Sequence, residues 1–143
     1  MLGTMPSPQS RLALFYYGHL QNRFWKILAA VFGEEPGSTI DAKKQFLLSH
    51  HIALWDVLHS CDINGASDSS IRNPVPNDFA PLFAAAPIRA VYMTGKTAWN
   101  LYRKFCAPLY QLPFFYLPSP SPANCTISFE RITAEYRKTL GGI

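Results

Sequence analysis

The chain has 143 residues, of which 48% are hydrophobic and 15% are charged. This length suits one domain with a buried core, and the composition excludes a disordered chain. We therefore expect a single domain over residues 1–143. The formal net charge of +4 favours a polyanionic partner, although charge alone does not identify one.

The sequence carries no sign of a membrane or secreted protein. No apolar run approaches the roughly 18 residues of a membrane-spanning helix, and the opening MLGTMPSPQSR lacks the features of a secretory signal. The cysteines Cys61, Cys106 and Cys125 are widely spaced and match no zinc-ligand pattern. We therefore predict a cytoplasmic protein with reduced cysteines, no metal and no membrane association.

The first half of the chain predicts two helices and a strand. Residues 23–32, RFWKILAAVF, place apolar side chains at helical spacing, and Gly33 should end this helix. Residues 41–49 form a short helix in this interpretation, with Asp41 as its N-cap. HIALWDVL, residues 51–58, is typical of a largely buried strand.

The second half predicts a loop, then two strands and three helices. Residues 61–77 are rich in Asn, Asp, Ser and Pro, so they should form a connecting loop. The elements expected after it are a short helix capped by Asn77 or Asp78 and ended by Pro87, a strand at 88–94, a helix at 97–105, a strand at 112–117 and an amphipathic helix at 127–140.

Strands that alternate with helices predict a three-layer α/β/α sandwich around a short, mostly parallel central sheet. Ligands of such sheets bind beyond the carboxyl ends of the strands. Three loops qualify: those after residues 51–58 and 88–94, and the loop PSPSPANC at 118–125. Residues 3–7, GTMPS, look like the loop after a first strand, yet only Met1 and Leu2 precede them. Either this strand is nearly absent, or the chain starts inside the natural protein.

Two loops rich in Pro and Ser are candidate binding segments. GTMPSPQS, residues 3–10, lacks the Lys and second Gly of a phosphate-binding P-loop, so a plain turn is the alternative. In PSPSPANC three prolines fix the backbone around Ser119, Ser121 and Asn124. Such a rigid polar loop suits contact with a phosphate or sugar, and a stiff surface loop is the alternative.

The segment YYGHLQNRFW, residues 16–25, crowds aromatic rings and polar side chains together, which suits a pocket that stacks on a flat ligand. Asp56 lies within an apolar strand, where a carboxylate is costly unless it is paired or functional. As a lone feature, a capping or ion-pairing role is the alternative. The histidines lack metal-site spacing, and no Ser or Cys lies in a nucleophile motif such as G-x-S-x-G.

Together these segments resemble the uracil-DNA glycosylase superfamily, and most closely its DNA-deoxyinosine (hypoxanthine-DNA) glycosylase branch. GTMPSPQS is similar to the first motif of the family, and YYGHLQNRFW is similar to a segment shared with the mismatch-specific uracil and thymine glycosylases. LWDVLHSC followed by DSSIRNPVPNDF resembles a stretch particular to the deoxyinosine branch. PSPSPANC stands in the place of the second motif, a loop at the DNA surface.

This resemblance implies an enzyme that hydrolyses the N-glycosidic bond of hypoxanthine, and of uracil or xanthine as further candidates, without metal or cofactor. The base leaves the stack, and a water attacks the sugar. Where relatives carry Asp or Asn in the first motif to position this water, the chain has Met5. We therefore expect Asn22 to be the catalytic residue, with an N-cap of the following helix as the alternative.

The resemblance also places the remaining site residues. Asp56 stands where mismatch glycosylases have an Asn that reads the base, and its carboxylate accepts from the N1–H of hypoxanthine or the N3–H of uracil. Tyr17 or His19 should stack on the extruded base or contact its edge. Leu117 replaces the His or Asn of other branches, and Leu20 replaces a proline. The base pocket should be lined by Thr4, Met5, Pro6, Tyr17, His19 and Asp56, and DNA should be contacted by Ser119, Ser121, Pro122, Ala123 and Asn124.

The expected partner is DNA that contains deaminated bases, bound by a monomer associated with the nucleoid. Two alternatives remain. One is a catalytically inactive relative that binds damaged DNA, which Met5 and Leu117 at catalytic places would permit. The other is a nucleoside-binding or small-molecule-binding protein on the same scaffold, for which no salt-dependent affinity for DNA is expected.

Overall fold

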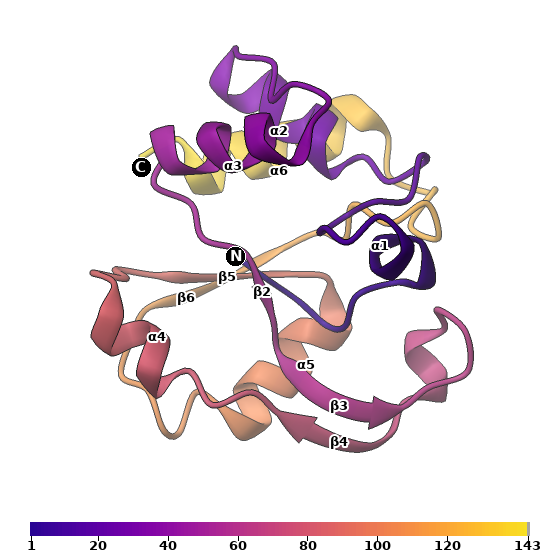
Figure 1. Cartoon of the computed structure of the whole chain (residues 1–143), viewed down its shortest axis with the longest axis vertical. Helices are drawn as coiled ribbons and strands as arrows, with labels where there is room; N and C mark the ends of the chain where they lie inside the picture. The colour runs from indigo at the N-terminus through magenta and orange to yellow at the C-terminus, as the bar shows by residue number, and fades with distance from the viewer. Residues whose placement is uncertain (143) are drawn as a thin grey trace.

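A computed structural model describes residues 1–142 of the chain as three layers with a parallel sheet in the middle (Figure 1). The strands are β1 (Leu2–Gly3), β2 (Trp55–Asp56), β5 (Val91–Thr94) and β6 (Phe114–Leu117). They pair in the order β2-β1-β5-β6, and all three pairings are parallel. The predicted sandwich around a short parallel sheet is therefore confirmed.

Helices cover both faces of the sheet (Figure 1). One face carries α2 (Phe24–Phe32), α3 (Ile40–Ser49) and α6 (Phe129–Leu140), and the other carries α4 (Ala80–Ala85) and α5 (Lys96–Phe105). A five-residue helix, α1 (Pro8–Leu12), follows β1 at the carboxyl ends of the strands. None of the helices among residues 1–142 is long and apolar enough to cross a membrane.

The core consists of two apolar clusters, because strand side chains alternate between the two faces of the sheet. In β5, Val91 and Met93 pack towards α5, while Tyr92 between them packs towards α2 and α6. The deepest residues of the α2/α3/α6 side are Phe24, Ile27, Leu28, Leu117, Ile132, Tyr136 and Leu140. Those of the α5 side are Val57, Phe79, Met93, Ala98, Tyr102 and Cys106.

Helix α2 ends where the sequence predicts, because Gly33 adopts a left-handed conformation at φ 68° and its N–H bonds to the carbonyl of Ala29. The cap predicted for α3 is wrong. Thr39 precedes the helix and its hydroxyl accepts from the N–H of Ala42 at 3.0 Å, while Asp41 lies inside the first turn. A Thr at this position can satisfy one of the free N–H groups of the first turn, so it takes the role assigned to Asp41.

Thr39→Ala is therefore expected to lower the free energy of unfolding by about 1 kcal/mol, because it removes the cap of α3. Thr39→Ser keeps the hydroxyl and should retain nearly all of the stability. Asp41→Ala should cost about half as much, since it removes only a favourable charge near the helix start. Urea denaturation of the three variants checks this order, and a larger loss in Asp41→Ala would contradict the capping assignment.

Residues 61–77 do not form a plain loop, which corrects the sequence prediction. The chain folds into an antiparallel pair, β3 (Leu58–Asp62) and β4 (Arg72–Pro76), joined through a 3-10 turn at Asp68–Ser70. Prolines within β4 mask the strand signal, but an edge strand with free N–H positions tolerates them. The polar residues lie on the exposed hairpin, so composition alone suggested a loop.

The strand predicted at 51–58 is shorter than expected. Only Trp55 and Asp56 join the parallel sheet, because the N–H of Ile52 bonds to the carbonyl of Leu47 and closes the end of α3. β1 is equally short, yet it is central and pairs with β2 and β5 on its two sides. The first strand therefore contributes only two residues to the sheet.

Candidate functional site

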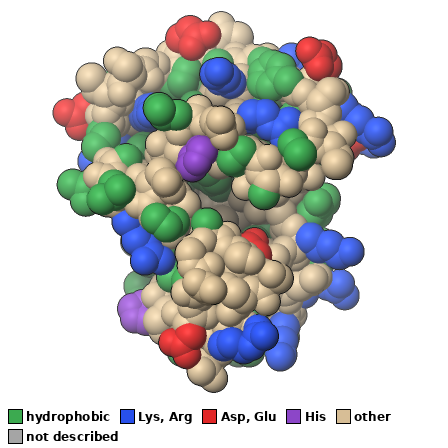
Figure 2. All heavy atoms as spheres, turned by 90° about the vertical axis from the view of Figure 1, so that its right-hand side faces the viewer, with side chains coloured by type: hydrophobic (Ala, Val, Ile, Leu, Met, Phe, Trp, Pro, Cys, Tyr) green, Lys and Arg blue, Asp and Glu red, His purple; other side chains and the backbone are tan. Residues whose placement is uncertain are grey.

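The candidate site lies at the carboxyl ends of β1 and β5, where the chain leaves the sheet in two directions. After β1 it runs to α2 and α3 on one face, and after β5 it runs to α5 on the other face. Such a divergence leaves a crevice between neighbouring parallel strands. Figure 2 shows this side of the molecule, with hydrophobic side chains around a central hollow and Lys and Arg side chains on both sides of it.

Three polar side chains from distant segments converge over Gly3, at the end of β1. A Cβ atom on Gly3 would lie 2.9 Å from Oδ1 of Asp56, 3.5 Å from Oη of Tyr17 and 3.9 Å from Oγ1 of Thr94. The Tyr17 and Thr94 hydroxyls are hydrogen bonded to each other at 2.8 Å. Glycine keeps the space between these groups open, because any larger side chain would press on the carboxylate.

The Asp56 carboxylate is buried but still lacks a partner. Only 8% of the residue is exposed, and no group of residues 1–142 donates a hydrogen bond to its carboxylate oxygens. Desolvation therefore raises its pKa from 3.8 to about 6. The backbone carbonyl of Asp56 is held by the side-chain amide of Asn77 at 2.8 Å, so the strand end is fixed while the carboxylate stays free to accept.

Tyr17 forms one wall of the site. Its ring stacks on Phe24, with ring centroids 3.8 Å apart and an interplanar angle of 14°, so one ring face is already covered. The bond to Thr94 and a left-handed backbone at φ 54° fix its position, and burial is the main cause that raises the pKa of its hydroxyl. His19 lies half-buried on the same loop, where its Nδ1 accepts from the N–H of Gln21.

Asn22 opens helix α2. Its Oδ1 accepts from the N–H of Phe24 at 2.9 Å, a local turn that Asn side chains favour. The N-cap of α2 is Arg23, so Asn22 is not the helix cap but forms a local turn one residue before it, and this turn uses only the oxygen. Within residues 1–142 the Nδ2 group makes no hydrogen bond, and the residue is half-buried. The amide thus keeps two donors available for a ligand.

The loop at 118–125 is organised by its own polar side chains. The hydroxyl of Ser119 accepts from the N–H of Ser121, and the hydroxyl of Ser121 accepts from the N–H of Ala123, each at 3.2 Å. Asn124 donates from Nδ2 to the carbonyl of Ser119. A hydroxyl that accepts from the backbone still carries its own hydrogen, so both serines can donate to an anion. Pro122 is half-buried and Ala123 is exposed at the turn.

Arg23 ties this loop to the aromatic segment, a link that sequence reasoning missed. Its guanidinium donates from Nη1 to the carbonyl of Ile127 at 2.7 Å and from Nη2 to the carbonyl of Asn124 at 2.9 Å. Its backbone N–H donates to the carbonyl of Pro120 at 3.1 Å. Asn22, the preceding residue, is thereby held beside the loop at 118–125. In the sequence, the one available signal of this link was the basic residue directly after Asn22.

Arg23→Ala is expected to destabilise the fold by about 2 to 3 kcal/mol, because two charge-assisted hydrogen bonds are lost. Arg23→Lys can keep only one of them and should lie between alanine and the wild type. Thermal unfolding followed by circular dichroism checks this order. An alanine variant as stable as the wild type would show that the two loops hold their positions without the guanidinium.

The first-motif residues lie at the same strand ends but do not all face the crevice. Thr4 is buried, and its carbonyl accepts from the N–H of Leu58. Met5 packs against the apolar cluster on the α5 side, and Pro6 is half-buried after it. The sequence analysis did not name Thr94 as a site residue, although it did name the loop after the strand at 88–94 as a candidate ligand site. The position of Thr94 at a strand end was the available signal.

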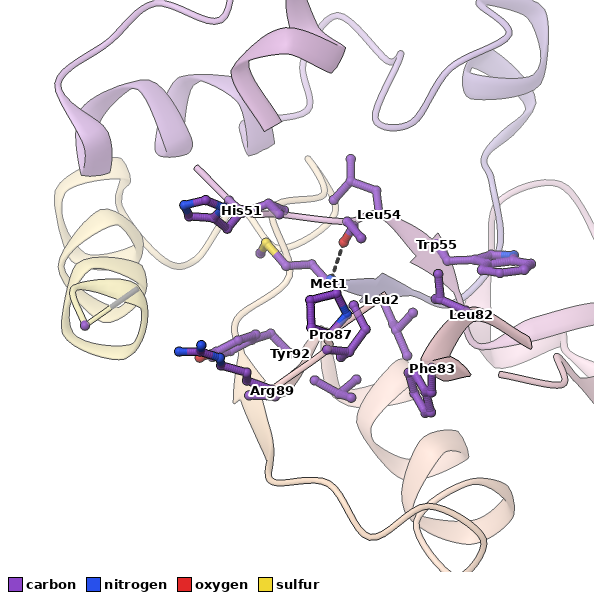
Figure 3. A pocket seen from close by; sticks show the side chains of 16 residues that line it. Met1, Leu2, His51, Leu54, Trp55, Leu82, Phe83, Pro87, Arg89 and Tyr92 are labelled. Atoms are coloured by element: carbon purple, nitrogen blue, oxygen red, sulfur yellow. Dashed lines mark hydrogen bonds between the residues drawn. The ribbon is translucent and has the colours of Figure 1, made fainter. Parts of the chain in front are cut away.

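A separate cavity of about 480 Å³ lies at the opposite ends of the strands. Figure 3 shows Met1 at its centre, with its amino group bonded to the carbonyl of Ala53 and with Leu54, Leu82, Phe83 and Pro87 around it. This cavity is lined mainly by apolar side chains and contains none of the predicted site residues. The polar groups that could act on a ligand converge instead at Gly3.

Comparison with known proteins finds similar chains in two Methanosarcina species. A protein of Methanosarcina acetivorans named hypoxanthine DNA glycosylase is 32% identical over 133 residues, which cover 92% of this chain and 83% of the relative. One of the same name from Methanosarcina barkeri is 33% identical over 67% of this chain and 62% of the relative.

The fold has a solved counterpart. The solution structure of a Methanosarcina acetivorans protein described as a uracil DNA glycosylase aligns with a TM-score of 0.79 and 30% identity, over 98% of this chain and 88% of that one. No family model matches the sequence.

Proposed function

Because the chain belongs to the hypoxanthine-DNA glycosylase branch of the uracil-DNA glycosylase superfamily, we propose that it excises deaminated bases from DNA. The substrates are hypoxanthine and, as further candidates, uracil and xanthine. The reaction is hydrolysis of the N-glycosidic bond of a base that has left the duplex. The protein acts as a monomer in this proposal and starts base excision repair.

The observation that carries this proposal is the free carboxylate of Asp56 beside Gly3 and Tyr17. An ionised carboxylate is an acceptor only, so it pairs with the N1–H of hypoxanthine or the N3–H of uracil. It repels adenine and cytosine, which present a ring nitrogen lone pair at that place. Guanine and thymine also carry such an N–H, but their stable pairing opposes extrusion, whereas a mismatched deaminated base leaves the stack more easily.

The chemical step needs few groups. Breaking the bond places positive charge on the sugar and negative charge on the departing base, and fixed hydrogen-bond donors stabilise such charge. The Nδ2 group of Asn22 is the available donor at the start of α2. Arg23 holds this residue next to the loop at 118–125. In our proposal the Nδ2 group orients the attacking water or contacts the scissile region. An amide cannot act as a general base at ordinary pH.

DNA contacts are assigned to the rim of the crevice. The hydroxyls of Ser119 and Ser121 point their remaining donors at phosphate in this proposal, and Pro122, Ala123 and Asn124 complete the contacting loop. The Lys and Arg side chains on both sides of the hollow supply the long-range attraction (Figure 2). Affinity for DNA should therefore fall steeply as salt concentration rises.

The deciding experiment incubates the purified protein with labelled duplexes that contain one hypoxanthine, uracil or xanthine, followed by alkaline cleavage at abasic sites. Strand scission at the lesion is the expected result. Salt-dependent binding to these duplexes without scission would leave an inactive DNA-binding relative. Neither binding nor scission by the folded protein would favour a nucleoside-binding or small-molecule-binding protein, and binding of free deoxyinosine would then be measured.

A further inference from the structure

Strand β6 is the outer strand of the sheet and presents aromatic rings at an open edge. One side of β6 pairs with β5, and no strand among residues 1–142 pairs with its other side. Phe115 and Tyr116 are 44% and 45% exposed. Proteins usually protect such an edge with charged residues or proline, but residues 114–117, FFYL, contain neither. The exposed rings therefore indicate a surface that another molecule covers.

Helix α5 lies beside this edge and adds a half-buried tryptophan and basic side chains. The Trp99 ring meets Tyr116 edge-on, with ring centroids 6.1 Å apart, and the guanidinium carbon of Arg103 lies over Trp99 at 5.7 Å from its centroid. Lys96, Trp99 and Arg103 follow one another at spacings of three and four residues, so they share one face of the helix. We call these four residues, Lys96, Trp99, Arg103 and Tyr116, the α5–β6 strip.

The strip belongs to a segment whose charges are all positive. Residues 79–129 contain four Lys and Arg residues and no Asp or Glu, so they account for the whole net charge of +4. Asp68, from the 3-10 turn of the hairpin, lies beside Thr97 on α5. Thr97 is two residues from Trp99 and therefore lies on nearly the opposite side of the helix. The charge of the strip attracts a polyanion and repels a second copy of the same surface.

The strip is continuous with the loop at 118–125. The N–H of Gly95 donates to the carbonyl of Leu117 at 2.8 Å, and a Cβ atom on Gly95 would lie only 3.2 Å from the Cβ of Ser119. The start of α5, with Lys96, is therefore packed directly against the loop to which DNA contacts are assigned. From Lys96 the strip leads away from this loop along α5 and β6.

We propose that the α5–β6 strip binds a single strand of DNA next to the site, an inference that rests on the proposed function. Unpaired bases offer their flat faces for stacking, and proteins that bind single strands combine aromatic side chains with basic ones along the backbone. Arginine next to an aromatic ring adds to such binding. A duplex hides the faces of its bases, so it would use the charges of the strip but not the exposed ring of Tyr116. Hypoxanthine in a single strand is accordingly a substrate of this site.

The first test measures the binding of a fluorescein-labelled, undamaged oligothymidine strand by fluorescence anisotropy. Tyr116→Ala is expected to raise the Kd by about 5- to 100-fold, the usual loss for one stacked base, and to leave the salt dependence unchanged. Lys96→Gln and Arg103→Gln should each reduce the slope of log K against log salt by about 0.7, the value for one phosphate contact on a single strand.

Two control variants change the same kinds of side chain outside the strip. Phe115→Ala removes a ring that is as exposed as Tyr116 but lies on the other face of β6. Lys138→Gln removes one positive charge from the last turn of α6. Both variants should bind the oligothymidine strand as the wild type does.

Excision separates the strip from the proposed function. On hypoxanthine in a single strand, Tyr116→Ala should lower kcat/KM by about the same factor as the affinity, while on the matched duplex it should stay within about twofold. Dependence of oligothymidine binding on Tyr116 supports the strip even if no base is released. Absence of excision from both strand forms overturns only the proposed function.

Three results would overturn the strip. The first is a wild type that does not bind the oligothymidine strand, and the second is an equal Kd for the wild type and Tyr116→Ala. The third is a wild type that sediments as a dimer which Tyr116→Ala dissociates, because the open edge of β6 would then pair two copies of the chain.

Discussion

Asn22→Ala is expected to reduce excision of hypoxanthine by about 100- to 1000-fold, the usual effect of removing one donor aimed at developing charge. The variant also loses the bond from Oδ1 to the N–H of Phe24, so its free energy of unfolding should fall by about 1 kcal/mol. A stability loss of this size leaves the protein folded at 25 °C, which keeps the two effects separable. Single-turnover rates on a hypoxanthine duplex, together with urea denaturation, measure both.

Asn22→Asp is the matched variant, because a carboxylate can still accept from Phe24 but cannot donate. Its stability should match that of the wild type within about 0.5 kcal/mol, while its excision rate at neutral pH falls nearly as far as that of Asn22→Ala. Activity close to the wild type in Asn22→Asp would mean that the Nδ2 donor is not needed. Asn22 would be only the residue that opens α2 if Asn22→Ala kept its activity as well.

Asp56→Asn is expected to lower kcat/KM for hypoxanthine by about 10- to 100-fold at pH 7.5, since a hydrogen bond to a charged acceptor becomes a neutral one. The wild type needs the ionised carboxylate, and burial raises its pKa to about 6. Its kcat/KM should therefore rise with pH up to about 6 and level off above. The rise of kcat/KM with pH should be missing in Asp56→Asn. If the variant still shows this rise, another group is responsible for the titration.

The same substitution should stabilise the protein at neutral pH. The folded carboxyl keeps its proton up to about pH 6, whereas the unfolded one loses it near pH 3.8. Wild-type stability therefore falls between these two pH values, by up to about 3 kcal/mol, and stays low above them. Asp56→Asn should gain up to this amount at pH 7.5 and nothing at pH 3.5. Asp41→Asn, an exposed carboxyl on α3, should show no such gain.

The sequence was sufficient for elements whose signal is local. The helical spacing of apolar residues and Gly33 predicted α2, and the apolar runs at 88–94 and 112–117 predicted β5 and β6 within a few residues. Where two local signals competed, prediction failed. Proline and serine hid the hairpin of β3 and β4, and Asp41 was chosen as the cap although Thr39 takes that position.

For the site, the sequence by itself identified the segments and several side chains: the resemblance in residues 16–25, Asp56 within an apolar strand, and a rigid polar loop at 118–125. Only the tertiary structure decided how they meet. The parallel order β2-β1-β5-β6 brings Asp56, Tyr17 and Thr94 together over Gly3, although Gly3 and Thr94 are 91 positions apart in the chain. Likewise, Arg23 reaches carbonyls more than 100 residues away. Local patterns determine what each segment can form, whereas contacts between distant segments depend on strand order and packing, which no single segment encodes.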